Sequence, residues 1–455
     1  MPHVSPRPVG RPGGRPADQL VGQLVELEVG AVAHGGHCVA RLDGRVVFVR
    51  HALPGEVVRA RVTEGGEGSR YLRADAVEIL SPSPDRVGPP CPYSGPGACG
   101  GCDWQHAGPV AQRALKAAVV REQLHRLAGL DVDVTVEPLD GRTDGLGWRT
   151  RVQHGVDDTG RLGFRRHRSH DVLAVDACLI THESAAAVGH LRAGWSGAAG
   201  VEVVAPAGSA ERLVVVTPAE RGGRRLRLPE VDAAVAVADT SPGEPGPALR
   251  RVKGRTWVAE RVAVGDWQRE FRITGGGFWQ VHPAAAETFV AVVLDLLAPR
   301  AGERALDLYS GVGLFAAALA DRVGPSGAVV AVESDARAVA DARRNLHDLD
   351  QVRLVRGAVA TALPGALAAL PGETADLVVL DPPRVGAGRR VVEQLCRAAP
   401  RAICYVACDP AALARDLATA GEQGYGLAAL RAFDAFPMTH HVECLALLTR
   451  TAQPD

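Results

Sequence analysis

The stretch LDLYSGVG, residues 306–313, decides the fold of the C-terminal part of this 455-residue chain. Apolar strand residues run directly into a turn whose two glycines let the backbone bend tightly and approach a ligand closely. A later apolar run ends at Glu333, whose carboxylate can accept hydrogen bonds from both hydroxyls of a ribose. The pattern therefore predicts a nucleotide-type ligand at the carboxyl ends of parallel strands.

Strand and helix patterns alternate through the region around this stretch. Helices are predicted over 314–323 and 336–347, and two further strands, 426–433 and 441–449, end the pattern. The apolar strands between them are predicted over 305–309, 328–333, 352–355, 377–380 and 402–407. This alternation predicts an α/β fold with a Rossmann-like, doubly wound parallel sheet.

The identity of the ligand stays open between two cofactors at this point. Ala316 completes a Gly-x-Gly-x-x-Ala pattern, which is also typical of NAD sites. S-adenosylmethionine is favoured because Asp307 lies in the strand before the glycine turn and Asp381, in the string LDPPR, ends a later strand. Both acidic residues belong to strands whose carboxyl edge is where ligands bind in this kind of fold.

One cysteine ends an apolar strand at the same edge. Cys408 follows the strand 402–407, and Asp409 and Pro410 then start a helix. Because a helix N-terminus stabilises a thiolate, we expect a reactive thiol at this position. A thiolate that adds to carbon 6 of a uracil ring makes carbon 5 nucleophilic enough to attack a sulfonium methyl group.

The reaction would then need a base that removes the proton from carbon 5. The string FPMTHHVEC, residues 436–444, offers Glu443 near the start of the last strand, with His440 and His441 as competitors. A carboxylate inside an apolar strand is unusual because burying an unpaired charge is costly, which favours a functional role. An ion pair with Arg384 is the structural alternative.

Three segments precede the catalytic domain, which we place at residues 273–455. Residues 1–17, rich in Pro, Gly and Arg, predict a disordered basic tail. Residues 18–80 contain five short strand patterns with an Asp-Gly hairpin signal, which predicts an OB-like β-barrel. Residues 81–272 predict a β-rich central domain, in which a helix over 110–127 can pack back on the catalytic domain.

A cysteine cluster opens the central domain. Three cysteines have the spacing C-x7-C-x2-C and a fourth follows later, so the expected metal ligands are Cys91, Cys99, Cys102 and Cys178. Four thiolates suit either zinc or an iron–sulfur cluster, and the spacing does not separate the two. Cys396 and Cys404, inside a helix and a strand, are expected in the hydrophobic core instead.

Charge gives a weak indication of the partner. The net charge is −1, so no global basic field points to nucleic acid. Two local stretches are basic, 165–168 and 221–227, and Arg165, Arg166 and Arg168 can hold phosphates there. Arginine abundance itself indicates little, because only two of the 51 lysines and arginines are lysines, a bias that we attribute to codon usage.

The sequence contains neither a signal-peptide pattern nor an apolar run of about 18 residues, the length that a membrane helix needs. We therefore expect a cytoplasmic protein that does not associate with a membrane. In that compartment cysteines are more often metal-binding, catalytic or buried than joined in disulfides.

Five strings together resemble the RNA (uracil-5-)-methyltransferase family, which modifies tRNA and ribosomal RNA. They are FWQVH (278–282), LDLYSGVG (306–313), LDPPR (380–384), YVACDP (405–410) and FPMTHHVE (436–443), and they occur in the family's order. Residues 18–80 resemble the TRAM domain, an RNA-binding barrel at the front of many members.

The resemblance implies the cofactor and the roles of six residues. The contacts of S-adenosyl-L-methionine would be Gln280, Tyr309, Glu333 and Asp381, the nucleophile Cys408 and the base Glu443. Some ribosomal RNA members carry a four-iron, four-sulfur cluster on a similar cysteine-rich string, which favours that cluster over zinc. The barrel and the cysteines together favour 23S ribosomal RNA over tRNA as the substrate, and no obligate protein partner is expected.

Three positions depart from the family's pattern. Asp409 stands where Asn is common, and a carboxylate beside the nucleophile tends to raise the pKa of the thiol. Leu314 replaces a frequently polar residue after the glycine turn, and the usual acidic residue near Gly357 is missing. A catalytically weakened RNA-binding relative is therefore the alternative to an active enzyme.

Overall fold

The computed structural model describes residues 20–66, 69–219, 225–239 and 248–451. The chain divides into two compact units, the first comprising Met1–Pro90 with Asp103–Gly108 and the second Cys91–Cys102 with Pro109–Asp455. The predicted tail lies outside the described residues, as does part of the second basic stretch. None of the helices in the described ranges has the length and apolar character that crossing a membrane requires.

The first unit is built on a five-stranded sheet in the order β1-β4-β5-β3-β2. Neighbouring strands are antiparallel except β3 and β5, which run parallel. The β2–β3 hairpin turns at Asp43 and Gly44, whose φ angles of 49° and 81° suit a type I′ turn. The strands are β1 (Leu24–Glu28), β2 (Cys38–Leu42), β3 (Arg45–Arg50), β4 (Val57–Glu64) and β5 (Tyr71–Ser81).

The second unit contains, within the described residues, an eight-stranded sheet in the order β18-β17-β16-β19-β20-β22-β21-β6. Neighbouring strands are parallel except at β22, which runs antiparallel to both β20 and β21. The strands are β6 (Val136–Pro138), β16 (Arg304–Leu308), β17 (Ala328–Glu333), β18 (Val352–Arg356), β19 (Leu377–Leu380), β20 (Ala402–Ala407), β21 (Tyr425–Asp434) and β22 (Glu443–Arg450). The predicted α/β sheet is confirmed.

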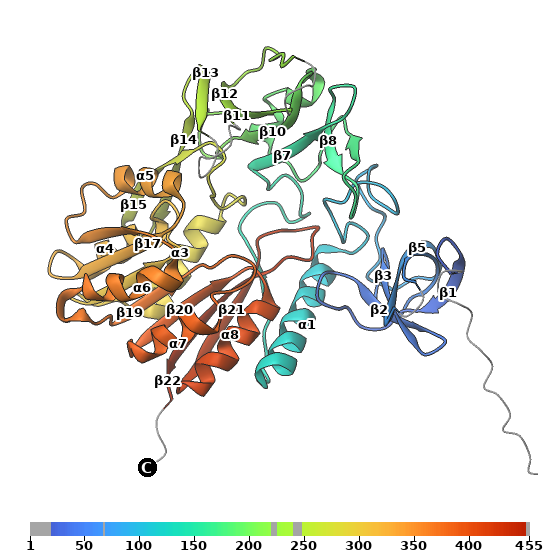
Figure 1. Cartoon of the computed structure of the whole chain (residues 1–455). Helices are drawn as coiled ribbons and strands as arrows, with labels where there is room; N and C mark the ends of the chain where they lie inside the picture. Colours follow the sequence, from blue (N-terminus) through green and yellow to red (C-terminus); the bar gives the residue numbers. More distant parts are fainter. Residues whose placement is uncertain (1–19, 67–68, 220–224, 240–247, 452–455) are drawn as a thin grey trace, which may run out of the picture. The chain divides into compact units, whose positions relative to one another are not determined.

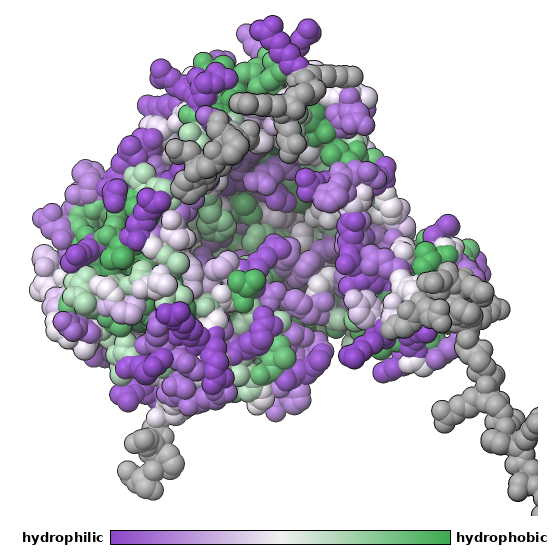
Figure 2. All heavy atoms as spheres, viewed as in Figure 1, coloured by the Kyte–Doolittle hydropathy of each residue, from purple (hydrophilic) through white to green (hydrophobic). Residues whose placement is uncertain are grey.

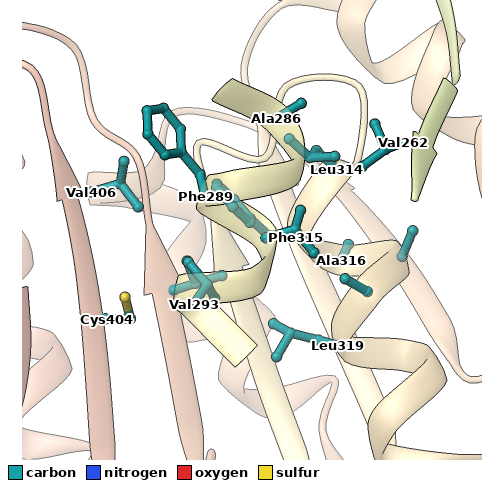
Figure 3. Close-up of a cluster of buried hydrophobic side chains, with 14 of the residues drawn as sticks. Val262, Ala286, Phe289, Val293, Leu314, Phe315, Ala316, Leu319, Cys404 and Val406 are labelled. Carbon is teal, nitrogen blue, oxygen red and sulfur yellow. The ribbon is translucent and has the colours of Figure 1, made fainter. Parts of the chain in front are cut away.

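Both faces of this sheet are buried under helices, as a parallel sheet requires. Cys404 and Val406 of β20 belong to one core cluster, in which they face α3, the helix that carries Phe289 and Val293, as Figure 3 shows. Ile403 and Tyr405 belong to the cluster on the opposite face. The first face is covered by α3 (Ala285–Leu297), α4 (Leu314–Val323) and α5 (Ala336–Asn345), and the second by α1 (Pro109–Ala128), α6 (Val359–Ala368), α7 (Arg389–Arg397) and α8 (Pro410–Glu422).

The helices at the carboxyl edge begin where the sequence provides a turn or a cap. Gly313 precedes α4 with φ 94°, and a Cβ there would lie 2.7 Å from the Leu346 side chain, so glycine is needed on two grounds. Asp335 and Asp409 cap α5 and α8 by accepting backbone N–H groups. Away from this edge, Figure 2 shows hydrophilic side chains over the outer faces of α7 and α8.

The central part of the second unit is a seven-stranded sheet in the order β13-β12-β11-β10-β7-β8-β9 within the described residues. Its strands are β7 (Arg151–Val156), β8 (Leu162–Arg165), β9 (Val172–Ala174), β10 (Ala198–Val204), β11 (Leu213–Pro218), β12 (Ala234–Ala238) and β13 (Leu249–Lys253). A separate hairpin, β14 (Trp257–Val264) and β15 (Trp267–Thr274), follows them.

The packing does not follow the division of the sequence at residue 273. Helix α1 lies beside α8 (Figure 1), and its residues Val120 and Leu124 are buried in the second core cluster. Strand β6 pairs with β21, and Phe271 of β15 lies in the first core cluster. These elements precede residue 273 but complete the catalytic domain, because their apolar faces are buried only there.

The position of α1 generates a stability prediction. Replacing Leu124, which is fully buried, by Ala should destabilise the catalytic domain by about 2–5 kcal/mol because it leaves a cavity. Chemical denaturation measures the loss. Leu127→Ala is the matched control, since Leu127 of the same helix is 38% exposed and should change stability by less than about 0.5 kcal/mol. Equal effects of the two substitutions would contradict the packing described above.

Candidate active site at the carboxyl edge of the sheet

Strand register brings three of the predicted residues together. Leu308 is paired with Val332 of β17 on one side and with Leu380 of β19 on the other. Tyr309, Glu333 and Asp381 are the residues that directly follow these three. They therefore leave neighbouring strands at the same level of the carboxyl edge.

The same geometry places Cys408 opposite Glu443. Strand β22 is antiparallel to β20, and the last pair in register at this end is Ala407 with Cys444. One step further along the register, Cys408 and Glu443 face each other across the two strands. Both side chains line the cavity described next.

A cavity of about 730 Å³ opens at this edge, a size in the range of about 300–1,000 Å³ that is typical of ligand sites. Its lining includes all six residues for which a catalytic or cofactor role is expected: Gln280, Tyr309, Glu333, Asp381, Cys408 and Glu443. The structure thus gathers the six residues at one site.

The glycine-turn side of the cavity suits a nucleoside. Glu333 is oriented by the backbone, because Oε2 accepts from Gly311 N (2.9 Å) and Oε1 from Asp335 N (2.7 Å). Next to this turn, Asp307 Oδ1 and Ser310 Oγ are buried without a hydrogen-bond partner among the described residues. Orphaned polar atoms at a ligand-facing turn fit a site that a polar ligand completes.

Burial controls the titration of Asp381, Glu443 and Cys408. It raises the pKa of Asp381 to about 7, and it raises the pKa of Glu443 well above its usual value. The pKa of Cys408 rises to about 12, first because of burial and then because of the nearby Glu443 and Asp381 carboxyls. Arg384 lowers the pKa of Cys408 and of Glu443, but not enough to cancel the increase.

The expectation of a thiolate at Cys408 is therefore wrong for the site as it stands. The helix N-terminus and Arg384 favour the anion, but burial and the surrounding carboxyl groups outweigh them. Asp409 raises the pKa of the Cys408 thiol, as predicted, but it is the smallest of the causes. Its carboxylate also caps α8 by accepting from Ala412 N at 2.8 Å, a task that Asn performs equally well.

Arg384, His441 and Phe278 also line the cavity, although no cofactor or catalytic role is predicted from the sequence for Arg384 or Phe278, and His441 is predicted only as a competitor of Glu443. Arg384 Nη2 lies 3.2 Å from His441 Nε2, and both residues line the cavity. No ion pair joins Arg384 to Glu443 within the described residues, so the structural alternative for Glu443 is not observed. Phe278 also lines the cavity and leaves 70% of its surface exposed, a signal that only a structure provides.

The four cysteines of the expected metal site lie in one region of the central domain. Gly101 N donates to Cys99 Sγ at 3.4 Å, and the thiols of Cys91, Cys99 and Cys178 influence one another electrostatically. The described residues nevertheless contain no group of three or more side chains arranged to hold a metal ion. None of the nine cysteines, all within the described ranges, forms a disulfide.

The basic stretch 165–168 lies next to the cysteines. Arg166 uses its guanidinium to donate to Gly97 O, and Gly100 N donates to Arg165 O. Arg165 and Arg168 remain exposed. Hydrogen bonds with this stretch thus hold the loop that carries Cys99. The exposure of Arg165 and Arg168 is compatible with contacts with phosphates.

Comparisons with known proteins show the family. Residues 249–451 match the family described as tRNA (Uracil-5-)-methyltransferase, and residues 18–77 match the TRAM domain. An uncharacterized RNA methyltransferase of Streptomyces coelicolor is 54% identical over 444 residues, which cover 95% of this chain and 94% of the relative. The 23S rRNA (uracil(1939)-C(5))-methyltransferase of Pseudomonas putida is 34% identical over 448 residues, 94% of each chain.

Among solved structures, the Pyrococcus abyssi tRNA (uracil-54, C5)-methyltransferase in complex with S-adenosyl-L-homocysteine superposes with a TM-score of 0.67. It is 24% identical, and the match covers 93% of this chain and 99% of that chain. At this level of identity the likeness concerns the fold.

A parallel sheet with one reversed strand, carrying its cavity at the carboxyl edge, defines a class I methyltransferase domain. The chain belongs to the RNA (uracil-5-)-methyltransferase family and carries an N-terminal TRAM domain. The predicted resemblance is confirmed, and the nicotinamide alternative is left without support.

The raised pKa of Cys408 generates a pH prediction. Below the pKa of about 12 the thiol is protonated, so its alkylation by iodoacetamide should accelerate about tenfold per pH unit through the alkaline range. Asp409→Asn should increase the rate a few-fold at each pH, because removing a negative charge lowers the pKa of the thiol. Mass spectrometry of the peptide that contains Cys408 measures the rate.

Asp335→Asn provides the matched control. Asp335 also caps a helix beside the cavity, but it is not among the groups that shift the pKa of Cys408. Its substitution should leave the alkylation rate unchanged. Fast alkylation that does not vary with pH would show a preformed thiolate and refute the argument.

Proposed function

We propose that this protein methylates carbon 5 of a uridine in 23S ribosomal RNA, with S-adenosylmethionine as the methyl donor. The observation that carries the proposal is the placement of Cys408 opposite Glu443 in one cavity with Glu333 and Asp381. Ribosomal RNA is favoured over tRNA because the relative named for 23S rRNA is 34% identical over nearly the whole chain.

The chemistry follows from these residues. The Cys408 thiol first loses its proton to solvent. The thiolate then adds to carbon 6 of the uracil, and the electron pair of the 5,6 double bond makes carbon 5 the nucleophile. The cofactor, held by Gln280, Tyr309, Glu333 and Asp381, supplies an electrophilic methyl group. Glu443, in its ionised form, removes the proton from carbon 5, the double bond re-forms and the thiolate leaves carbon 6.

The Cys408 step can be trapped. With S-adenosylmethionine and RNA that contains 5-fluorouridine, the wild-type protein should form a complex stable on a denaturing gel, because fluorine cannot leave as a proton. Cys408→Ser should abolish the complex. Cys404→Ala, four residues earlier and fully buried outside the cavity, should retain it. An undiminished complex with Cys408→Ser would disprove the covalent mechanism.

The RNA substrate is tested with separated RNA classes. Tritiated methyl groups should enter 23S rRNA from cells that lack the enzyme, whereas tRNA from the same cells should remain unlabelled. Labelling of tRNA alone would show that tRNA, and not 23S rRNA, is the substrate. RNA binding without any labelling would support the weakened relative.

We also propose a four-iron, four-sulfur cluster on Cys91, Cys99, Cys102 and Cys178. The support is their spacing and their common location, and no step of the reaction depends on the cluster. Protein purified without oxygen should be brown and contain iron and sulfide, and Cys99→Ser should lose both. Colourless protein containing zinc would establish the alternative metal, and protein with neither would show that the cysteines bind no metal.

A further inference from the structure

Helix α1 reaches into the loop that leads to Glu443. The loop, residues 435–442, connects β21 to β22, and its members Phe436 and His441 line the cavity. We propose that Gln112 and Lys116 of α1 are positioning residues that hold this loop, and through it Glu443, in place for proton removal. This inference rests on the proposed function.

Lys116 fixes the beginning of the loop. Its side chain is completely buried, and Nζ lies 2.5 Å from Oδ1 of Asp434, the last residue of β21. The same ammonium group donates to Phe436 O at 3.0 Å. A buried ammonium group is held tightly by such partners, because breaking the ion pair would leave a buried charge unpaired, which is costly.

Gln112 fixes the middle of the loop. Its Oε1 accepts from Met438 N at 2.8 Å, and its Nε2 donates to Met438 Sδ at 3.2 Å. Met438 has φ 68°, a left-handed conformation that residues other than glycine rarely adopt. Such a conformation persists where the surroundings enforce it, and here a side chain 326 positions away supplies the contacts.

The loop transmits its position to the site through further bonds. Thr439 Oγ1 donates to Phe436 O, the carbonyl that Lys116 also binds, and His441 N donates to Thr439 Oγ1. Glu443 follows two residues later, as the first residue of β22. A shift of the loop would therefore displace Phe436, His441 and the base together.

The amino-acid composition of the chain supports a specific role for the lysine at position 116. Lys116 and Lys253 are the two lysines among 51 lysines and arginines, so arginine meets nearly every other need for a cation in this protein. The guanidinium is larger and has five N–H donors to satisfy, whereas the buried ammonium has three. Lys116→Arg should therefore impair the enzyme, and Lys253→Arg, at an exposed position of β13, should not.

The test separates positioning from a merely structural role. Addition to 5-fluorouridine RNA needs Cys408 and the cofactor, whereas turnover of ordinary RNA also needs Glu443. Gln112→Leu and Lys116→Met should form the fluorinated complex at rates within a few-fold of wild type, while turnover falls on the order of 100-fold, as a displacement of about 1 Å can cause. On ordinary uridine RNA they should accumulate the methylated covalent complex. Gln112→Glu keeps the acceptor for Met438 N and should recover part of the turnover.

Each outcome decides between the hypotheses. Glu443→Gln should accumulate the same complex, and Cys408→Ser should form none; failure of either result refutes the proposed function itself. If both behave as stated, unchanged turnover in Gln112→Leu and Lys116→Met refutes the positioning role. A parallel loss of complex formation and turnover in these two variants, with Lys116→Arg equal to wild type, also refutes it and leaves only a folding role.

Discussion

The insertion of β22 between β20 and β21 is the constraint on which the site depends. Because β22 runs against both neighbours, its first residue, Glu443, lies at the edge where the parallel strand β20 ends. The register then sets Glu443 opposite Cys408. A slip of β22 by one residue would turn Glu443 toward the opposite face of the sheet, away from Cys408.

The same constraint explains why Cys408 and Glu443 both resist ionisation. A strand in the middle of a sheet is buried on both faces, and Glu443 is 5% exposed as a result. Burial disfavours the charged form of the thiol and of the carboxylic acid alike, and Asp381 adds to both effects. Proton transfer in this site is therefore coupled to what fills the cavity, because a bound ligand changes the solvation and the charges around these groups.

The sequence predicted the edge of the sheet well because its signals are local. An apolar run of six residues that stops at Cys408 identifies β20, and a glycine turn identifies the start of α4 at Leu314. The ion pair of Lys116 with Asp434, 318 positions apart, has no local signature, and neither does the pairing of β6 with β21. The largest cause of the raised pKa of Cys408, its burial, was also missed, because the depth of burial depends on contacts among several strand ends.

A small apolar cluster connects the central domain to both sides of the site. Trp148, Ile180 and Met438 form it, and Val281 and Phe436 pack against it, so the segments that carry Gln280 and precede Glu443 meet at one point. Cys102 and Cys178 pack against the same cluster. Whatever these cysteines bind, their surroundings are continuous with the two catalytic segments. The central domain thus supports, through packing, the positions of the segments that carry Gln280 and precede Glu443.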